Sequence, residues 1–318
     1  MTPPVQHSLA SGFGARTTAA EVLAGVDVRG ALVVLTGGYS GLGEQATRAF
    51  AAAGATVVVP ARRPEAAAAA LAGVPGVEVA ELDLADQESV RRFAEDFLAS
   101  GRTIDVLIGN AGVMATPETR VGPGWEAQFA TNHLGHYALA NRLWPALADG
   151  GARVVSLSSA GHRRSPVRFD DVMFERGYDK WEAYGQAKTA NALFAVQLDA
   201  LGAAAGVRAF SVHPGGILTP LQRHLPREEM VALGWIDEQG RSLVEAFKTP
   251  EQGAATEVWA ATSPQLAGLG GLYCEDCDVA ELNDGETRTG VRSWATDPAQ
   301  AARLWTLSAE LTGVDAFA

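Results

Sequence analysis

Short apolar segments rich in Val, Ile and Leu recur along the first two thirds of the 318-residue chain. Within each segment the apolar residues follow one another without a polar residue at every second position. This pattern is typical of strands that are buried on both faces of a sheet. The predicted strands cover residues 31–36, 55–61, 77–82, 104–110, 152–158 and 207–213, and a seventh short strand is expected at 270–273.

Ala-rich or amphipathic stretches separate the predicted strands and indicate helices. They cover residues 41–53, 64–72, 86–99, 124–148 and 181–205. Strands that alternate with helices form βαβ units, in which helices cover both faces of a parallel sheet. We therefore expect an α/β protein: a single doubly wound Rossmann-type domain with a mostly parallel sheet of about seven strands.

Two regions interrupt this alternation. Residues 1–29 precede the first strand and form an N-terminal arm, with a short helix expected in "TTAAEVLAG". The rest of the chain, 30–318, is interpreted as one domain. Residues 217–250 mix prolines and aromatic residues with charges, and an insertion of this length is typical of a lid or substrate loop.

The charge balance narrows the range of partners. The chain is 47% hydrophobic and 19% charged and carries a formal net charge of −12, which argues against a nucleic-acid partner. No apolar run approaches the roughly 18 residues of a membrane helix. We therefore expect no membrane span. The N-terminus also lacks the basic start and apolar core of a secretory signal, so we expect a cytoplasmic protein.

Metal and thiol chemistry find little support in the sequence. Cys274 and Cys277 form a CxxC motif, but no second Cys/His pair follows at zinc spacing, and acidic neighbours raise a thiol pKa. We expect these thiols to stay reduced and to have no redox role. No metal is expected, and the histidines at positions 133, 136, 162 and 213 are interpreted as structural.

A glycine-rich turn follows the first predicted strand. The stretch "GGYSGLG" begins at Gly37 and leads into a predicted helix. Glycines let the backbone approach a pyrophosphate closely, and the N-terminus of the helix offers free N–H groups and the positive end of its dipole. The turn is therefore interpreted as a phosphate-binding site, and the alternative is an ordinary strand–helix turn.

The end of the second predicted strand indicates which dinucleotide binds. A fold that prefers NAD places an acid there for the ribose 2′-hydroxyl, whereas a 2′-phosphate requires an arginine. The stretch "VVVPARRPE" has Arg62 and Arg63 and no acid before them, and Tyr39 and Ser40 can add hydroxyl contacts. We expect NADP(H) to be preferred, with NAD(H) as a second cofactor. The alternative is that both arginines are solvated loop residues.

The stretch "EAYGQAKTAN" places Tyr184 four residues before Lys188. On a helix this spacing puts both side chains on one face. The pair fits either an ordinary helix or a proton-transfer pair. A phenol is a poor acid at neutral pH, and a nearby ammonium lowers its pKa. Only other motifs in the chain separate the two interpretations.

Those motifs occur in a fixed order: "TGGYSGLG", "LDL", "NAG", "NHLGH", "SLSS", "YGQAK" and "HPGGILT". Over about residues 30–275 the chain thereby resembles the short-chain dehydrogenase/reductase family. It is most similar to the retinol dehydrogenase branch and to the WW-domain-containing oxidoreductase, because 25 residues separate Ser159 from Tyr184. The lead-in "TTAAEVLAGVDVRG" also resembles that of the latter protein, although no WW domain is present.

The resemblance assigns roles to individual residues. Tyr184 matches the proton donor and acceptor, and Lys188 its partner, which also binds the ribose. Ser159 matches the residue that orients the substrate oxygen, and Asn132 the residue that holds a water in a proton relay. The glycine-rich turn and the arginines place the cofactor on Gly37, Tyr39, Ser40, Gly41, Leu42, Gly43, Arg62 and Arg63. The resemblance adds Asp83, Leu84, Asn110, Ala111, Gly112, Tyr184, Lys188, Pro214, Gly215, Ile217 and Thr219.

The resulting hypothesis is an NADP(H)-dependent oxidoreductase that interconverts an alcohol and a carbonyl. The apolar and aromatic residues of 217–250 favour a hydrophobic ketone or aldehyde as substrate. One alternative is a non-catalytic NADP(H)-binding regulator, and another is an epimerase or dehydratase of the same family. The resemblance also implies a homodimer or homotetramer that forms through two long helices, including the one that carries Tyr184.

The stretch "RFDDVMFERGYDKW" lies between the serine pair and Tyr184. Its two adjacent acids, Asp170 and Asp171, are expected to be solvated. Its aromatic residues either wall the substrate pocket or pack in the core, and they are Phe169, Phe174, Tyr178 and Trp181.

Overall fold

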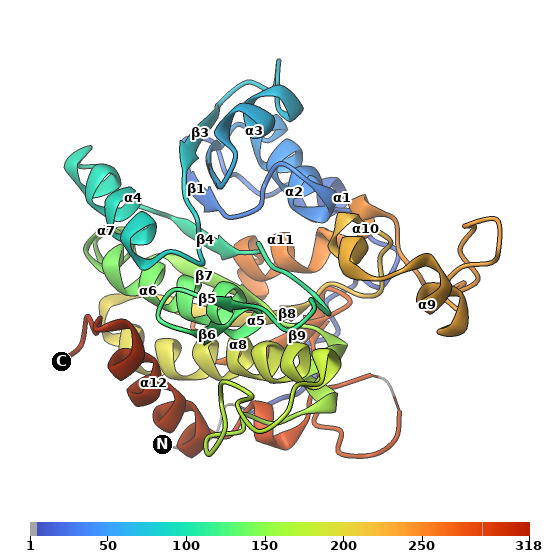
Figure 1. Ribbon diagram of the computed structural model, residues 1–318. Helices are drawn as coiled ribbons and strands as arrows, with labels where there is room; N and C mark the ends of the chain where they lie inside the picture. The colour runs from blue at the N-terminus through green and yellow to red at the C-terminus, as the bar shows by residue number, and fades with distance from the viewer. Residues whose placement is uncertain (1–4, 288) are drawn as a thin grey trace.

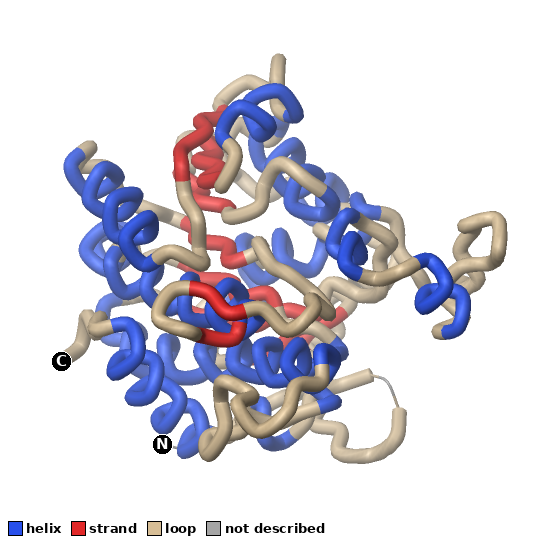
Figure 2. Tube along the Cα trace, in the orientation of Figure 1, coloured by secondary structure: helices blue, strands red, loops and turns tan. Residues whose placement is uncertain are grey.

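Eight strands form one sheet through the middle of the computed structural model, which describes residues 5–287 and 289–318 (Figures 1 and 2). Their order is β10-β9-β8-β7-β4-β1-β2-β3, and every pair is parallel except β9 and β10. The strands are β1 (Leu32–Leu35), β2 (Thr56–Ala61), β3 (Val77–Glu81), β4 (Val106–Gly109), β7 (Arg153–Leu157), β8 (Arg208–His213), β9 (Leu272–Glu275) and β10 (Asp278–Val279).

This sheet confirms the predicted fold class and adds one strand to the predicted seven. β10 pairs antiparallel with β9 after a turn in which Asp276 and Cys277 have φ of 49° and 60°. Two residues are too few to give a hydrophobic pattern, so the sequence predicts no strand there. The central strands lack polar alternation because both of their faces are buried, as in β1, where all four residues are buried.

Helices cover both faces of the sheet, which makes it doubly wound (Figure 1). On one face, α1, α2, α10 and α11 pack against the strands around Phe50 and Trp259. On the other, α4, α6 and α8 build a core around Tyr137 and Phe194. The helices are α1 (Ala19–Leu23), α2 (Gly41–Ala52), α3 (Pro64–Ala70), α4 (Gln87–Ala99), α5 (Ala127–Phe129), α6 (Gly135–Arg142), α7 (Trp144–Gly150), α8 (Lys180–Gly202), α9 (Arg227–Ala232), α10 (Pro250–Gly253), α11 (Ala255–Thr262) and α12 (Pro298–Thr312).

The predicted helix at 124–148 is wrong as a single element. The segment begins in a hairpin of β5 (Arg120–Val121) and β6 (Trp125–Glu126), continues as α5, and then forms a π-helical turn, Ala130–Leu134, before α6 and α7. The buried carboxylate of Glu126 starts α5, because it accepts hydrogen bonds from the N–H groups of Gln128 and Phe129 at 2.9 and 2.6 Å. π-helical turns are rare and occur frequently at functional sites.

α12 packs along α8 and covers much of it (Figure 1). The ring of Trp305 on α12 stacks on Phe194 of α8, with 6.0 Å between centroids and 4° between planes. Residues 183–199 of α8 are all buried within the chain. α12 therefore occupies part of the surface of α8, and the oligomeric state that the family resemblance implies stays a prediction.

The N-terminal arm is tied to the far edge of the sheet. The hydroxyl of Ser8 and the N–H of Leu9 donate to the carboxylate of Asp278 at 2.6 and 2.8 Å. The short helix expected in the arm is α1, and it begins in a capping box formed by Thr18 and Glu21. The division of the chain at residue 29 stays a prediction. Within the described residues no helix is both long and apolar enough to span a membrane.

Residues 217–250, here called the lid, project from the body at the right of Figure 1. The lid holds a 3-10 helix, Pro220–His224, followed by α9. It is fastened to the start of α8: Lys180 Nζ lies 2.6 Å from a carboxylate oxygen of Glu229, and the rings of Trp181 and Trp235 meet edge to face at 6.0 Å.

Two expectations for side chains have different outcomes. Asp171 is not solvated: its side chain is 3% exposed, it pairs with Arg168 at 3.3 Å, and it accepts from the N–H of Glu175. Asp170 is exposed, as expected.

Both cysteines are free and buried. Burial is the main reason that the pKa of Cys277 is raised to about 11, and the acidic neighbours Asp276 and Asp278 add to it.

Candidate active site

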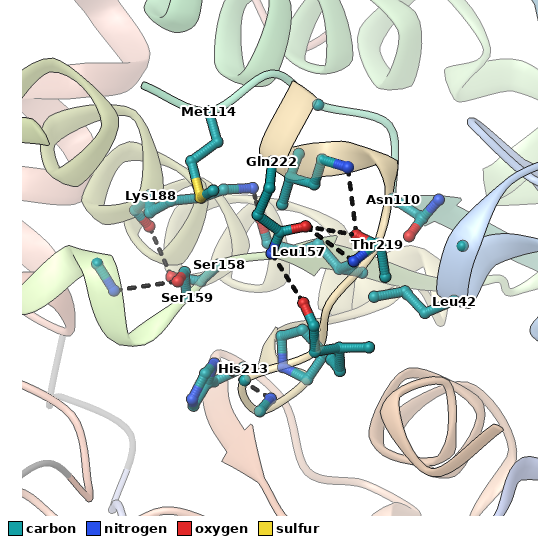
Figure 3. Close-up of a pocket in the computed structure, with 18 of the residues that line it drawn as sticks. Leu42, Asn110, Met114, Leu157, Ser158, Ser159, Lys188, His213, Thr219 and Gln222 are labelled. Atoms are coloured by element: carbon teal, nitrogen blue, oxygen red, sulfur yellow. Dashed lines mark hydrogen bonds between the residues drawn. The ribbon is translucent and has the colours of Figure 1, made fainter. Parts of the chain in front are cut away.

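A cavity of about 1190 Å³ opens where β1, β2, β4, β7 and β8 end at their carboxyl edges. Ligands of open α/β sheets bind at this edge. The cavity is lined by 19 of the 21 predicted site residues, and the two that do not reach it are Gly43 and Asn132. Figure 3 shows side chains that enter it from opposite sides, with Lys188 and Ser159 on one side and Asn110 and Leu42 on the other.

Tyr184 and Lys188 lie one turn apart on α8, as predicted. The helix starts at Asp179, whose carboxylate accepts from the N–H groups of Trp181 and Glu182, both at 2.8 Å. Both side chains line the cavity but are only 5% exposed. Lys188 Nζ donates to the carbonyl oxygen of Leu157 at 2.9 Å and lies 5.6 Å from the centroid of the Tyr184 ring.

Ser159 follows β7 and caps a 3-10 helix, Ala160–Arg164. Its Oγ accepts a hydrogen bond from the N–H of Gly161 at 3.0 Å, and it also lines the cavity. Gly161 is required at this position, because a Cβ there would lie 2.8 Å from Cε1 of Tyr184. The turn after β7 therefore holds the Ser159 hydroxyl beside the Tyr184 ring.

Asn132 lies in the π-helical turn behind the cavity rather than on its wall. Its Oδ1 accepts from the N–H of Val113 at 2.8 Å, and its Nδ2 donates to the carbonyl oxygen of Val113 at 2.9 Å. A Cβ on Gly112 would lie 3.1 Å from Oδ1 of Asn132 and 3.8 Å from Nζ of Lys188. Asn132 thus fixes the 110–113 floor from behind, close to Lys188.

Burial controls the titration of both proton-transfer candidates. It raises the pKa of Tyr184 to about 12, and the Ser159 hydroxyl acts in the opposite direction. It lowers the pKa of Lys188 to about 8. The spacing of Tyr184 and Lys188 predicts a lowered pKa for Tyr184. The structure shows the opposite, because desolvation of the phenolate is the larger effect.

The glycine-rich turn has the close contacts expected of a phosphate cradle. Gly37 and Gly41 have φ of 68° and 59°, which glycine adopts readily. Asn110 Nδ2 donates to the carbonyl oxygen of Thr36 at 2.8 Å and braces the turn from below. Gly43 lies under the turn, where a Cβ would be 2.4 Å from Asn110 Nδ2, so it shapes the cradle without lining it.

The other predicted cofactor residues border the same cavity. Arg62 and Arg63 are exposed at the end of β2, where α3 begins. Thr219 starts the lid in a capping box with Gln222 and reaches over the glycine turn, because a Cβ on Gly41 would lie 3.3 Å from its Cβ. The remaining lining residues of this group are Tyr39, Ser40, Asp83, Leu84, Ala111, Pro214, Gly215 and Ile217.

Several residues that line the cavity are not among the predicted site residues. Lys248 is almost fully buried and pairs with Asp276 at 2.6 Å. His213, interpreted as structural, lines the cavity and accepts from the N–H of Ala160 through Nδ1 at 3.2 Å, which ties the Ser159 turn to the end of β8. The others come mainly from the lid and the arm, and they include Arg16, Met114, Leu221, Arg223, Trp235 and Phe247.

The aromatic residues between Ser159 and Tyr184 have different positions. Only Trp181 lines the cavity. Phe174 is buried under the guanidinium of Arg168, 4.4 Å from its ring centroid, and Phe169 packs beside α12 with Arg303 over its ring. Tyr178 accepts from Gln128 Nε2 at 2.9 Å. Three of the four side chains therefore pack within the protein, and one borders the cavity.

The fold is a doubly wound α/β domain, and its cavity lies at the carboxyl edge of the sheet, where such domains bind their ligands. The short chain dehydrogenase family model matches residues 31–230, and the chain belongs to the short-chain dehydrogenase/reductase family. Proteins of this family use NAD or NADP, and their chemistry is consistent with interconversion of alcohols and carbonyls.

Individual relatives place the chain near the retinol dehydrogenase branch. It is 46% identical over 296 residues to a "Probable oxidoreductase" of Streptomyces lividans, covering 90% of this chain and 98% of that protein. It is 36% identical to retinol dehydrogenase 12 of Mus musculus, covering 91% and 88%. A crystal structure of an uncharacterized protein from Mycobacterium paratuberculosis superposes with a TM-score of 0.71 at 34% identity, covering 95% and 99%.

Proposed function

We propose that the protein is an NADP(H)-dependent oxidoreductase that interconverts an alcohol and a carbonyl and reduces a hydrophobic ketone or aldehyde. One observation carries the proposal: Tyr184, Lys188 and Ser159 open onto the same cavity as the glycine-rich turn. The lining supports a dinucleotide, because one continuous cavity of about 1190 Å³ borders Gly37 and Gly41 of the glycine-rich turn and also the arginines that follow β2.

The bound cofactor supplies the hydride, and the protein supplies geometry and a proton. Tyr184 is placed to donate its phenol proton to the carbonyl oxygen as negative charge develops there. Ser159 donates a second hydrogen bond to that oxygen, which helps to the extent that it strengthens in the transition state. The proton transfer is the part of the reaction that these residues perform.

Lys188 supports Tyr184 by its charge. Its Nζ lies 5.6 Å from the centroid of the Tyr184 ring, and a cation at this distance stabilises the phenolate that forms when the proton leaves. Lys188 also has two donor positions beyond its bond to Leu157, and one of them serves the cofactor ribose. Asn132 supports this arrangement by holding the cavity floor next to Lys188.

The substrate end of the cavity is apolar. Met114 and Tyr184 pack with Leu221, Leu225 and Trp235. A polar substrate would lose its water shell against these side chains without new hydrogen bonds, which is unfavourable. The lining therefore favours a hydrophobic carbonyl compound, whose apolar surface gains free energy on burial.

A carbonyl panel tests the proposal. We expect the purified protein to consume NADPH with medium and large apolar ketones or aldehydes, and to be slower with small hydrophilic ones. NADPH absorbance and product chromatography provide the measurement. NADPH binding without turnover on any substrate would favour a regulator. An isomerised or dehydrated product without net NADPH consumption would favour an epimerase or dehydratase.

The cofactor preference has its own test in Arg62→Ala. We expect it to weaken NADPH binding about 10- to 100-fold, because a charge-assisted hydrogen bond contributes about 1.5–3 kcal/mol, and to change NADH binding little. Isothermal titration calorimetry gives both affinities. Arg92→Ala is the control, since Arg92 is exposed on α4 away from the cavity. An equal loss for both cofactors would contradict the assignment of Arg62 to the 2′-phosphate.

A further inference from the structure

The lid contributes a third arginine at the arginine end of the cavity. Arg223 belongs to the 3-10 helix Pro220–His224, which starts at Thr219 directly above Gly41 of the glycine turn. It borders the same cavity as Arg62 and Arg63, which follow β2, and as Tyr39 in the turn. Three segments that are far apart in the sequence thus meet at this end of the cavity, and two of them bring guanidinium groups to it.

No carboxylate balances this charge. Within the described residues, none of the three arginines has a carboxylate oxygen within 4.0 Å, although the chain is acidic overall. Other arginines have such a partner: Arg102 lies 2.8 Å from Glu78, and Arg208 lies 2.8 Å from Asp199.

The electrostatics of Arg223 show that the three groups interact. Its pKa is lowered first by burial and then by the positive charges of Arg62 and Arg63, while Tyr39 acts in the opposite direction. Like charges brought together in this way oppose each other. Gathering them without an anion is unfavourable, and a dianionic ligand relieves the repulsion.

We propose that Arg223 is a specificity-determining residue that binds the 2′-phosphate of NADP(H) together with Arg62 and Arg63. This inference rests on the proposed preference for NADP(H). A phosphate monoester offers three oxygens to guanidinium groups, which bind it bidentately. The arginines that Arg223 faces follow β2, where the adenosine ribose binds in dinucleotide folds, so the 2′-phosphate is favoured over the pyrophosphate as its partner.

The position of Arg223 links the cofactor to the substrate cavity. Leu221 and Leu225, two residues before and after it, both pack beside Tyr184 and Met114. When Arg223 binds the phosphate, the 3-10 helix is held in the position that forms this apolar wall. The 2′-phosphate therefore strengthens cofactor binding and also orders the wall against which the substrate packs.

Calorimetry with NADPH and NADH tests the proposal on the full-length protein. We expect Arg223→Ala to weaken NADPH binding about 10-fold and NADH binding less than about twofold, with Arg223→Lys intermediate, because lysine keeps the charge but loses the bidentate contact. Arg227→Ala is the matched control: it removes an exposed arginine of the same lid whose side chain donates to the carbonyl oxygen of Glu238. It should leave both affinities unchanged.

A double-mutant cycle shows whether the arginines share one phosphate. If they do, the Arg62→Ala/Arg223→Ala variant loses less NADPH affinity than the product of the two single losses, because neighbouring contacts to one group are not additive. KM for a substrate of the carbonyl panel should also rise severalfold in Arg223→Ala with NADPH, but not with NADH. Should Arg223→Ala fold poorly, Arg223→Gln serves in its place.

The outcomes separate the two proposals. Equal weakening of NADPH and NADH by Arg223→Ala would place Arg223 on the pyrophosphate or in lid packing and would overturn its role on the 2′-phosphate. That role is also overturned if Arg62→Ala reduces the NADPH preference and Arg223→Ala does not, although the cofactor proposal then stands. If neither variant changes the preference, these arginines do not bind the 2′-phosphate, and this inference fails. Equal affinities of the unmodified protein for NADPH and NADH would overturn the proposed NADP(H) preference itself.

Discussion

Tyr184→Phe is expected to reduce kcat about 10²- to 10⁴-fold, the usual contribution of a positioned general acid. The phenylalanine keeps the ring and its packing but has no proton to give to the carbonyl oxygen. NADPH affinity should stay within about twofold, because the ring still fills its place on α8. NADPH consumption with the best substrate of the carbonyl panel measures the first effect, and calorimetry the second.

Tyr178→Phe is the matched control. Tyr178 lies six residues before Tyr184 and outside the cavity, and its hydroxyl bonds Gln128 and the carbonyl oxygen of Thr116. Loss of that hydroxyl should cost about 1 kcal/mol of stability and leave kcat unchanged. Full activity in Tyr184→Phe would rule out Tyr184 as the proton donor. A loss confined to NADPH affinity would instead assign it to the cofactor site alone.

The free energy of unfolding is expected to fall steeply as the pH drops from about 6.5 towards about 5. His133, His136 and His162 are buried, and His213 is half-buried at the cavity wall. Desolvation is the main cause of their lowered pKa values. The pKa is about 3 for His133 and His213 and about 4 for His136 and His162. In the unfolded chain a histidine titrates near 6.5.

These pKa values give the direction in which the free energy of unfolding changes with pH. Below pH 6.5 the histidines are protonated in the unfolded chain but stay neutral in the folded protein. The stability that is fully present above this pH is therefore lost as the pH falls. Each such proton costs about 1.4 kcal/mol per pH unit. Burial raises the pKa of Glu126, Glu257 and Glu275, so these groups take up protons first in the folded state and offset part of the loss.

The free energy of unfolding is expected to fall by between about 1.4 and about 5 kcal/mol per pH unit. This range corresponds to one to four protons that the unfolded chain binds in excess of the folded protein. Urea unfolding followed by tryptophan fluorescence at several pH values measures it. His133→Leu should reduce the slope by about 1.4 kcal/mol per pH unit, and His7→Ala, at an exposed histidine, should not change it. A stability that is constant across this range would show that the folded protein accepts these protons.

Sequence patterns predict the sheet well because strand burial is a local signal. Runs such as 31–36 and 55–61 are mostly apolar because helices cover both faces of the strands, and that requirement shows in the residues themselves. The same patterns predict a single helix at 124–148, because the amphipathic pattern continues through the π-helical turn. Only the contacts of Glu126 and Asn132 show where that helix is interrupted.

Motif positions predict which residues border the cavity, but not how each contributes. Gly43 and Asn132 belong to the same motifs as their neighbours, yet both lie behind the wall and brace it. The pKa of Tyr184 depends on desolvation by the surrounding residues, and residue spacing carries no information about desolvation.

By itself, the sequence determined the order of the seven parallel strands along the chain, the glycine-rich turn and the alignment of Tyr184 with Lys188, because each depends on residues close together in the chain. The tertiary structure decided that Arg223 joins Arg62 and Arg63, that His213 holds the Ser159 turn, and that α12 covers α8. These contacts join segments far apart in the sequence. They depend on how the lid and the C-terminal helix fold back onto the sheet, which no local pattern of residues specifies.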